Sequence, residues 1–336
     1  MKHFIHYISV WFLTLALASC CDKEFLWEDS PLPGCMFRES CSVKAVAVIS
    51  ESTWILAGEK TEYNRIPFFI TDNKGISWYE VSSIPGEDIL CLQYSNDRAL
   101  ATIKDSDNNF TCYLSDDSGN NWRKIYSLFS SLPPAVKLFS KDCIAISSMD
   151  AVIISNDGGH SWEEVHNDTP ACIFTGFNEH NVILTSDHVR KEWNTLVLLD
   201  PFNHEKDTVA MELDAHIFPN GSQDLLSWAG RRILPIYSVK EHSLYKISEI
   251  HCKESYRVRP YYVHSFRDHV YIVIGNERKP DKTGTLYASS THGLSWTKIR
   301  RFRAGECYFS TGKEDLYYFD TDGILHVIQP ISQPDN

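Results

Sequence analysis

An eight-residue pattern recurs four times in this chain and restricts its fold more than any other feature. The copies span residues 71–78, 115–122, 155–162 and 289–296, and we call them the box turns. Each begins with Ser or Thr and has Gly at its fifth position and Trp at its eighth, and the first three have Asn or Asp at the third position. A unit that recurs in this way indicates one supersecondary structure repeated along the chain.

Each box turn lies between two segments with the composition of β-strands, so the sequence predicts a β-hairpin at each. Residues 67–71 and 152–155 are apolar runs that lead into the first and third turns. We expect glycine to provide the positive φ, polar side chains to bond the turn backbone, and tryptophan to cover the turn. The residues expected in these fold-holding roles are Asn73, Gly75, Trp78, Asp117, Gly119, Trp122, Asp157, Gly159, Trp162, Gly293 and Trp296.

The spacing of the box tryptophans predicts the number of repeats. The first three lie 44 and 40 residues apart, and the fourth follows after 134 residues, which corresponds to three further repeats. Two degenerate turns are therefore expected in the gap. One lies at residues 238–245, where Tyr245 replaces Trp, and the other lies near residues 200–207.

The two ends of the repeat array are each incomplete. The segment that begins at Ala304 contains three strand-like runs and no fourth, whereas residues 31–38 form a turn and a short strand without partners. An N-terminal strand that completed the C-terminal repeat would close a ring and remove the free sheet edges. The sequence therefore predicts an all-β, seven-bladed β-propeller over residues 31–336, with six or eight blades as the alternatives.

The repeated pattern resembles the Asp-box, or BNR repeat, of the sialidase-like superfamily. Asp-box propellers include sialidases and other glycoside hydrolases as well as non-catalytic binding proteins, so the resemblance implies a fold and not an activity. Sialidases also carry an Arg-Ile-Pro motif whose arginine binds the substrate carboxylate, and this chain has Arg65-Ile66-Pro67. Here, however, the motif lies on the strand that enters a box turn, and a related run recurs at residues 232–235. We therefore interpret Arg65 as a blade feature and keep it only as a weak sialidase-like candidate.

The remaining groups of a sialidase site are present as residue types but not as a pattern. Such a site needs three arginines, a Tyr nucleophile activated by a Glu, and an Asp acid/base. The sequence does not reveal whether suitable residues converge. Examples are Asp88, Arg190, Arg259, Tyr261 and Tyr308.

The N-terminus has the features of an export signal. A short basic start precedes the apolar stretch 4–18, which is too short to span a bilayer as a mature helix. Residues 17–20 (LASC) match a bacterial lipobox, so we expect a signal peptide at 1–19, a lipidated Cys20 and a tether at 20–30. Cleavage after Ala18 without a lipid is the alternative. Cys21 rather than Asp at the next position favours the outer membrane of the cell envelope.

Composition restricts the partners and the cofactors. The formal net charge is −12 at pH 7, so nucleic acid is not expected as a partner, because phosphate binding requires a basic surface. The cysteines show no zinc spacing and the histidines no HExxH motif, and we expect neither metal nor cofactor. Of ten cysteines, Cys20 is the expected lipidation site and Cys21 follows it in the tether. We expect most of the other eight to be buried or in disulfides, with Cys91 near Cys112 and Cys35 near Cys41.

Two functions fit these observations. The first is a non-catalytic propeller, bound to the bilayer through Cys20, that binds a protein partner in the bacterial cell envelope, either as an assembly factor or as a toxin-neutralising inhibitor. The irregular stretches 186–195 and 275–285 are the candidate binding loops. The alternative is a glycan-active or glycan-binding propeller, in which Trp193 or Trp228 would stack on sugar rings.

Overall fold

The computed structural model of the chain describes residues 26–331 apart from sixteen short gaps. The gaps are residues 38–40, 131–132, 148–151, 166–171, 178–180, 187–193, 212–216, 220–224, 229, 232, 241–242, 253–256, 267–268, 277–282, 304 and 311–314. Within the described parts, no helix is long and apolar enough to cross a bilayer.

Over these residues the strands form seven antiparallel sheets, which we number in chain order. Sheet 1 contains β2 (Val43–Val48), β3 (Trp54–Gly58), β4 (Arg65–Thr71) and β5 (Tyr79–Pro85). Sheet 2 contains β6 (Asp88–Ser95), β7 (Arg98–Lys104), β8 (Asn109–Ser115) and β9 (Arg123–Phe129). Sheet 3 contains β10 (Ala135–Leu138), β11 (Ile144–Ser147), β12 (Val152–Ser155) and β13 (Glu163–Val165). Sheet 4 contains β14 (Cys172–Phe177), β15 (Val182–Ser186), β16 (Asn194–Leu199) and β17 (Lys206–Met211).

The remaining three sheets follow the same order of strands with two variations. In sheet 6 the short β20 precedes the inner strand β23, so its first to fourth blade strands are β23, β24, β25 and β26, and in sheet 7 the fourth strand is the N-terminal β1. Sheet 5 contains β18 (Ile217–Pro219), β19 (Leu225–Trp228), β21 (Ile233–Lys240) and β22 (Ser243–His251). Sheet 6 contains β20 (Gly230–Arg231), β23 (Arg257–Phe266), β24 (His269–Asn276), β25 (Thr283–Ser289) and β26 (Thr297–Arg303). Sheet 7 contains β27 (Cys307–Ser310), β28 (Leu316–Phe319), β29 (Ile324–Ile331) and β1 (Leu26–Met36).

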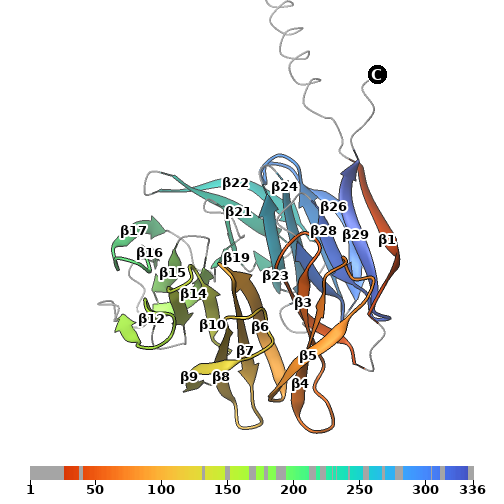
Figure 1. Cartoon of the computed structure of the whole chain (residues 1–336). Coiled ribbons are helices and arrows are strands. Elements are labelled where there is room, and N and C mark those ends of the chain that lie inside the picture. Colours follow the sequence, from red (N-terminus) through yellow and green to blue (C-terminus); the bar gives the residue numbers. More distant parts are fainter. Residues whose placement is uncertain are drawn as a thin grey trace, which may run out of the picture.

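The sheets are arranged around a ring of inner strands (Figure 1). Each of β2, β6, β10, β14, β18, β23 and β27 contacts the next strand in this series, and β27 contacts β2 again. The all-β class and the propeller architecture predicted from the sequence are therefore confirmed. The fourth strand of each sheet lies farthest from this ring.

The ring is closed by the N-terminal strand, as the incomplete repeats predict. In Figure 1 the orange-red β1 lies beside the blue β29, and the two strands pair antiparallel from Leu26↔Ile331 to Pro31↔His326. Because β1 is an edge strand, it accommodates Pro31 and Pro33 without the loss of an interior ladder bond. β1 begins at Leu26, so residues 26–30, which we expected in the tether, belong to the sheet.

The hydrophobic core is a series of layers between neighbouring sheets. One cluster joins Ile55 and Phe68 of sheet 1 to Ile89 and Ile103 of sheet 2, and the other described clusters likewise join adjacent sheets. The middle strands β3, β4, β7 and β11 are buried at nearly every position, so both faces of these sheets are apolar and each face packs on one neighbour. No blade can bury both faces without its neighbours.

Both degenerate turns predicted in the sequence gap are hairpin turns. The ladder between β21 and β22 continues to Lys240↔Ser243. Between β16 and β17, the backbone N–H of Asp200 donates to the carbonyl of Glu205 (2.9 Å), and His204 has a positive φ of 60°. These turns join the third and fourth strands of their sheets, which is the position that the box turns occupy in sheets 1, 2, 3 and 6.

Candidate functional site

The four box turns share one hydrogen-bonded frame. The buried hydroxyl at the first position accepts a hydrogen bond from the backbone N–H of the glycine. The N···O distances are 2.9 Å for Gly75, 2.7 Å for Gly119, 2.8 Å for Gly159 and 2.9 Å for Gly293. All four glycines have a positive φ, between 80° and 91°. Their lack of a Cβ therefore permits the turn.

The third residue of each box turn accepts a second backbone hydrogen bond, from the seventh residue. In the third turn, Asp157 Oδ1 accepts from the N–H of Ser161 (2.9 Å), and its Oδ2 accepts from the Ser161 hydroxyl (2.6 Å). These bonds, with those from Ser155 and the backbone of His160, hold the pKa of Asp157 well below its usual value. Asn73 makes the equivalent backbone bond in the first turn (3.0 Å), so the frame does not require a charge.

The box turns also pack against the preceding sheet, which the sequence did not reveal. A Cβ on Gly119 of sheet 2 would lie 2.2 Å from Cδ1 of Ile55 in sheet 1. The indole Nε1 of Trp122 donates to Ser82 Oγ on β5 (3.1 Å), and that hydroxyl donates to the carbonyl of Gly119 (2.6 Å). Trp296 makes the same contact with Ser248 on β22 (3.0 Å). Repeat positions therefore connect neighbouring blades as well as forming turns.

A serine on the preceding fourth strand is the part of this contact that sequence reasoning missed. Ser82 and Ser248 both follow a β-bulge in the fourth strand of their sheets, opposite Phe68 and Ile236. The only sequence signal is that Ser82 follows Trp78 by four residues and Ser248 follows Tyr245 by three. This signal is weak because the residue at the same place in sheet 2 is Tyr126, which contacts Trp162 through its ring (4.9 Å).

Arg65 lies at the start of β4, the third strand of sheet 1, and not on the inner ring. Its Nε donates to Ser83 Oγ on β5 (2.8 Å), and its Nη2 donates to the Ser83 carbonyl. The side chain is exposed and links two outer strands. This placement agrees with the interpretation of Arg65 as a blade feature.

Most of the other candidates from the sequence, or their side chains, lie outside the described residues. Cys20, Cys21, Arg190 and Trp193 lie outside the described residues. The side chains of Trp228, Arg259 and Tyr261 also lie outside the description, as do the central parts of the two candidate loops, residues 187–193 and 277–282. Asp88 is exposed at the start of β6, and its carboxylate accepts from the N–H of Ile89 (2.9 Å).

The densest polar contacts occur where the ring closes, between β26 and sheet 7. We call this group the closure cluster: Asp29, Arg300, Glu306, Tyr308, Tyr318 and His326. The Arg300 guanidinium lies 2.9 Å from Glu306 Oε1 and 3.3 Å from Asp29 Oδ2, and its Cζ lies 4.3 Å from the Tyr318 ring centroid. The Glu306 side chain is only 3 % exposed, so its charge depends on Arg300 for compensation.

The two tyrosines of the closure cluster are hydrogen-bond donors to carboxylates. The Tyr308 hydroxyl donates to Glu306 Oε2 (2.8 Å), and the Tyr318 hydroxyl donates to Asp29 Oδ1 (3.0 Å). Burial raises the pKa of both hydroxyls, and the carboxylates raise it further. Both therefore stay protonated. A Tyr nucleophile needs the opposite tendency.

A cavity of about 440 Å³ opens beside this cluster. Residues of both charges line it, including Arg300, Arg301, Arg303, Asp320, Asp322 and His326. Arg301 and Arg303 are exposed, whereas Arg300 is held by Asp29 and Glu306. The three arginines therefore do not converge on one anion. A mixed surface of this kind suits a polar peptide segment better than a single sugar carboxylate.

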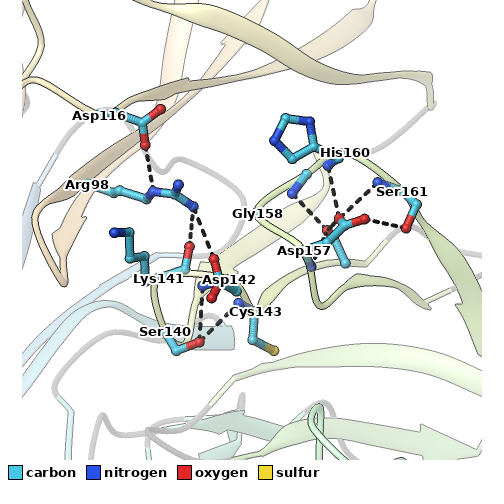
Figure 2. Close-up of polar contacts among 12 residues, drawn as sticks. Arg98, Asp116, Ser140, Lys141, Asp142, Cys143, Asp157, Gly158, His160 and Ser161 are labelled. Atoms are coloured by element: carbon cyan, nitrogen blue, oxygen red, sulfur yellow. Dashed lines mark hydrogen bonds and ion pairs between the residues drawn. The ribbon is translucent and has the colours of Figure 1, made fainter.

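A second polar cluster joins sheets 2 and 3 (Figure 2). Figure 2 shows the Arg98 side chain pointing between Asp116 and Asp142, and it donates to the carbonyl of Lys141. The distances are 2.6 Å from Nε to Asp116 Oδ1 and 3.7 Å from Nη1 to Asp142 Oδ1. Because Arg98 is 13 % exposed and bonded on both sides, this cluster is a joint between blades and not an open binding group.

The expected disulfides are absent among the described cysteines, and this corrects the sequence analysis. Cys91 on β6 and Cys112 on β8 are both paired with Thr102, which lies between them on β7. Because one strand lies between them, two interstrand spacings separate them by about 10 Å, beyond the roughly 7 Å limit for a disulfide. Cys112, Cys143, Cys35 and Cys252 are buried. The described residues also contain no group of His, Cys, Asp or Glu that could hold a metal ion.

Comparison with known proteins identifies the fold and no closer relationship. No family model and no curated protein sequence matches the chain. The structure of YCF48 bound to D1 peptide has a TM-score of 0.56 at 13 % identity, with 92 % of this chain and 97 % of that chain covered. YCF48 from Cyanidioschyzon merolae gives 0.57 at 17 %, covering 90 % and 98 %. KlHsv2 with loop 6CD replaced by a Gly-Ser linker gives 0.52 at 14 %, covering 84 % and 90 %. At these identities the likeness shows the β-propeller fold alone.

Proposed function

We propose that this chain is a non-catalytic propeller of the Asp-box type, anchored in the bacterial cell envelope through Cys20, that binds a protein partner. The observation that carries this proposal is the cavity beside the closure cluster. The cavity presents charges of both signs, while in the closure cluster beside it the tyrosines remain protonated and the buried Glu306 carboxylate is paired with Arg300. Such a surface can recognise a polar peptide and has no activated group for chemistry.

A propeller of similar architecture, YCF48, was solved with a D1 peptide bound. The architecture is therefore compatible with a peptide ligand, which supports a role in the assembly of a complex. Neutralisation of a toxin would use the same surface chemistry. The predicted lipobox places the propeller at a membrane, and by the residue after Cys20 we propose the outer membrane.

One observation favours the alternative of a glycoside hydrolase of the sialidase type. Tyr308 and Glu306 are hydrogen-bonded at 2.8 Å, and they are the residue types of a sialidase nucleophile and its activating base. Against this alternative, Glu306 is already paired with Arg300. Arg300 itself lies on β26, the strand of sheet 6 farthest from the inner ring.

The test is affinity purification of the full chain from its native membrane, with identification of proteins recovered in stoichiometric amount. The variant Arg301→Glu with Arg303→Glu reverses the free charge of the cavity. Lys298→Glu is the matched control, because Lys298 is exposed on the same strand and does not line the cavity. Loss of one abundant partner in the double variant only would support the proposal. Equal recovery by all variants would remove the cavity from the binding surface. Absence of any partner, with release of sugar from a glycan panel, would favour the hydrolase.

A further inference from the structure

The tether enters the propeller at the face that carries the box turns. In sheet 1 the third strand ends at Thr71, where the box turn begins. In sheet 7 the third strand is β29, which ends at Ile331, and Leu26 of β1 is paired with that residue. Leu26 therefore occupies the place in sheet 7 that follows a box turn in the other sheets. The start of β1 and the tip of β29 lie at the same end of this sheet (Figure 1).

The tether is short compared with the blade. Five residues lie between Cys20 and Leu26, and the six Cα–Cα steps that join the two span at most about 20 Å when the chain is fully extended. The blade is longer, because the eight residues of β29, along which β1 runs, span roughly 26 Å. An anchor at Cys20 therefore holds the box-turn end of sheet 7 near the bilayer and cannot bring the opposite face to it.

The residue at the tip of each box turn differs according to its distance from this anchored sheet. The tip is the sixth position, directly after the glycine. Sheets 1 and 6 are the neighbours of sheet 7 in the ring, and their tips are Ile76 and Leu294, each 63 % exposed. In sheets 2 and 3, farther from the anchor, the same position is occupied by Asn120 and His160, which are also exposed.

Charge follows the same gradient. The box turns of sheets 1 and 6 contain one carboxylate between them, Asp72. The turns of sheets 2 and 3 contain three: Asp116, Asp117 and Asp157. Near Ile76, the carboxylate of Glu51 is paired with Lys74 (3.3 Å), which reduces its repulsion from an anionic surface. Of the four box turns, the two beside sheet 7 are thus more apolar and less acidic than those of sheets 2 and 3, whereas the hairpin turn of sheet 4 exposes Phe202 (53 %).

We propose that Ile76 and Leu294 insert shallowly into the lipid bilayer on either side of the Cys20 anchor, so that the box-turn face of sheets 6, 7 and 1 lies on the membrane. This inference rests on the proposed anchoring. Two separate apolar tips that flank an anchored edge match a planar surface, and apolar area buried at the headgroup boundary adds to the affinity that the lipid anchor provides. The sheet 2 and sheet 3 side of the ring is then tilted away from the lipid.

The test places a photo-cross-linking amino acid, one site at a time, in the full chain in its native membrane. Positions 76 and 294 are expected to form lipid adducts. Positions 120 and 160 are matched controls at the same place in other box turns, and position 129 is a control at the opposite end of its sheet, where Phe129 is 74 % exposed. The controls are expected to yield several-fold fewer lipid adducts. Thermal unfolding of each variant checks that the fold is retained.

The outcomes separate this inference from the anchoring on which it rests. If Cys20→Ala leaves the chain in the membrane fraction unchanged, the proposed anchor fails and the inference fails with it. If Cys20→Ala releases the chain but positions 76 and 294 give only protein adducts, the anchor stands and these tips face a partner. Lipid adducts of equal yield at 120 and 160 would likewise overturn the tilted orientation.

Discussion

The Nε atom of Arg300 lies 3.3 Å from Oδ2 of Asp29, which joins the fourth strand of sheet 6 to the N-terminal strand that closes the ring. The same guanidinium compensates Glu306, whose side chain is 3 % exposed. Ring closure therefore depends on one cation shared by two carboxylates from different parts of the chain. Removal of that cation would leave a buried charge, which is more costly than the absence of the whole pair.

We expect Arg300→Met to reduce the free energy of unfolding by about 3–5 kcal/mol, the range for an uncompensated buried charge. Adding Glu306→Gln should recover part of this loss, because the uncompensated charge is then absent. Urea unfolding of both variants measures the difference. Arg65→Met is the control, since Arg65 is exposed and should cost no more than about 1 kcal/mol. Equal losses for Arg300→Met and Arg65→Met would contradict the role of the closure cluster.

Gly119→Ala should be more destabilising than Gly34→Ala, although both glycines have a positive φ, of 91° and 78°. Each substitution costs about 1–2 kcal/mol for the left-handed backbone. A Cβ at Gly34 meets nothing within 4 Å, whereas at Gly119 it meets Ile55 Cδ1, which adds about 1–3 kcal/mol of overpacking.

A double variant tests whether that contact is the cause. Ile55→Val removes the clashing Cδ1 atom, so Gly119→Ala with Ile55→Val should be less destabilised than the sum of the single variants. Thermal or urea unfolding gives the coupling energy. Additive losses would show that the backbone alone explains the effect.

Asp157→Asn should flatten the pH dependence of stability in acid. The Ser161 side chain, followed by backbone N–H groups, lowers the pKa of Asp157 from 3.8 in the folded protein. A lowered folded pKa contributes stability that is complete above pH 4 and is lost as the pH falls through the folded value. Asn73 fills this position in the first box turn, so the variant should fold. Unfolding titrations of Asp157→Asn between pH 5 and 2 should differ from those of the wild type, and identical profiles would contradict this prediction.

The thiols of Cys112 and Cys143 should resist alkylation at pH 8 in the native protein. Burial raises the pKa of each to about 12, and Asp200 contributes at Cys143, so the reactive thiolate is scarce. Because these folded thiols hold their protons more tightly than unfolded thiols do, stability should fall as the pH rises from about 9 toward 12. Mass spectrometry after iodoacetamide treatment, with and without guanidinium, measures the labelling. Native labelling, or a Cys91–Cys112 cross-linked peptide, would contradict the structure.

Local sequence patterns predicted the repeating hairpins and the closure of the ring by the first strand. The glycine, hydroxyl and tryptophan of a box turn act within eight residues, so their spacing alone carries the geometry. Arg65 was interpreted as a blade residue on equally local grounds, because the sequence places it on the strand that enters the first box turn. The sequence did not select a cysteine pairing, and the one that the repeat suggested, Cys91 with Cys112, is ruled out because β7 lies between their strands.

The sequence by itself determined that this chain folds into β-hairpin repeats in a closed ring, because turn chemistry and period are local properties. Only the tertiary structure decided which residues meet between blades. Ser82 and Trp122 are 40 residues apart, and Tyr318 and Asp29 are 289 apart, yet each pair is hydrogen-bonded. Such contacts depend on the twist and register of neighbouring sheets, which place side chains of different repeats together. The closure cavity and the two exposed apolar tips on either side of sheet 7 arise in the same way, from the order of the blades around the ring.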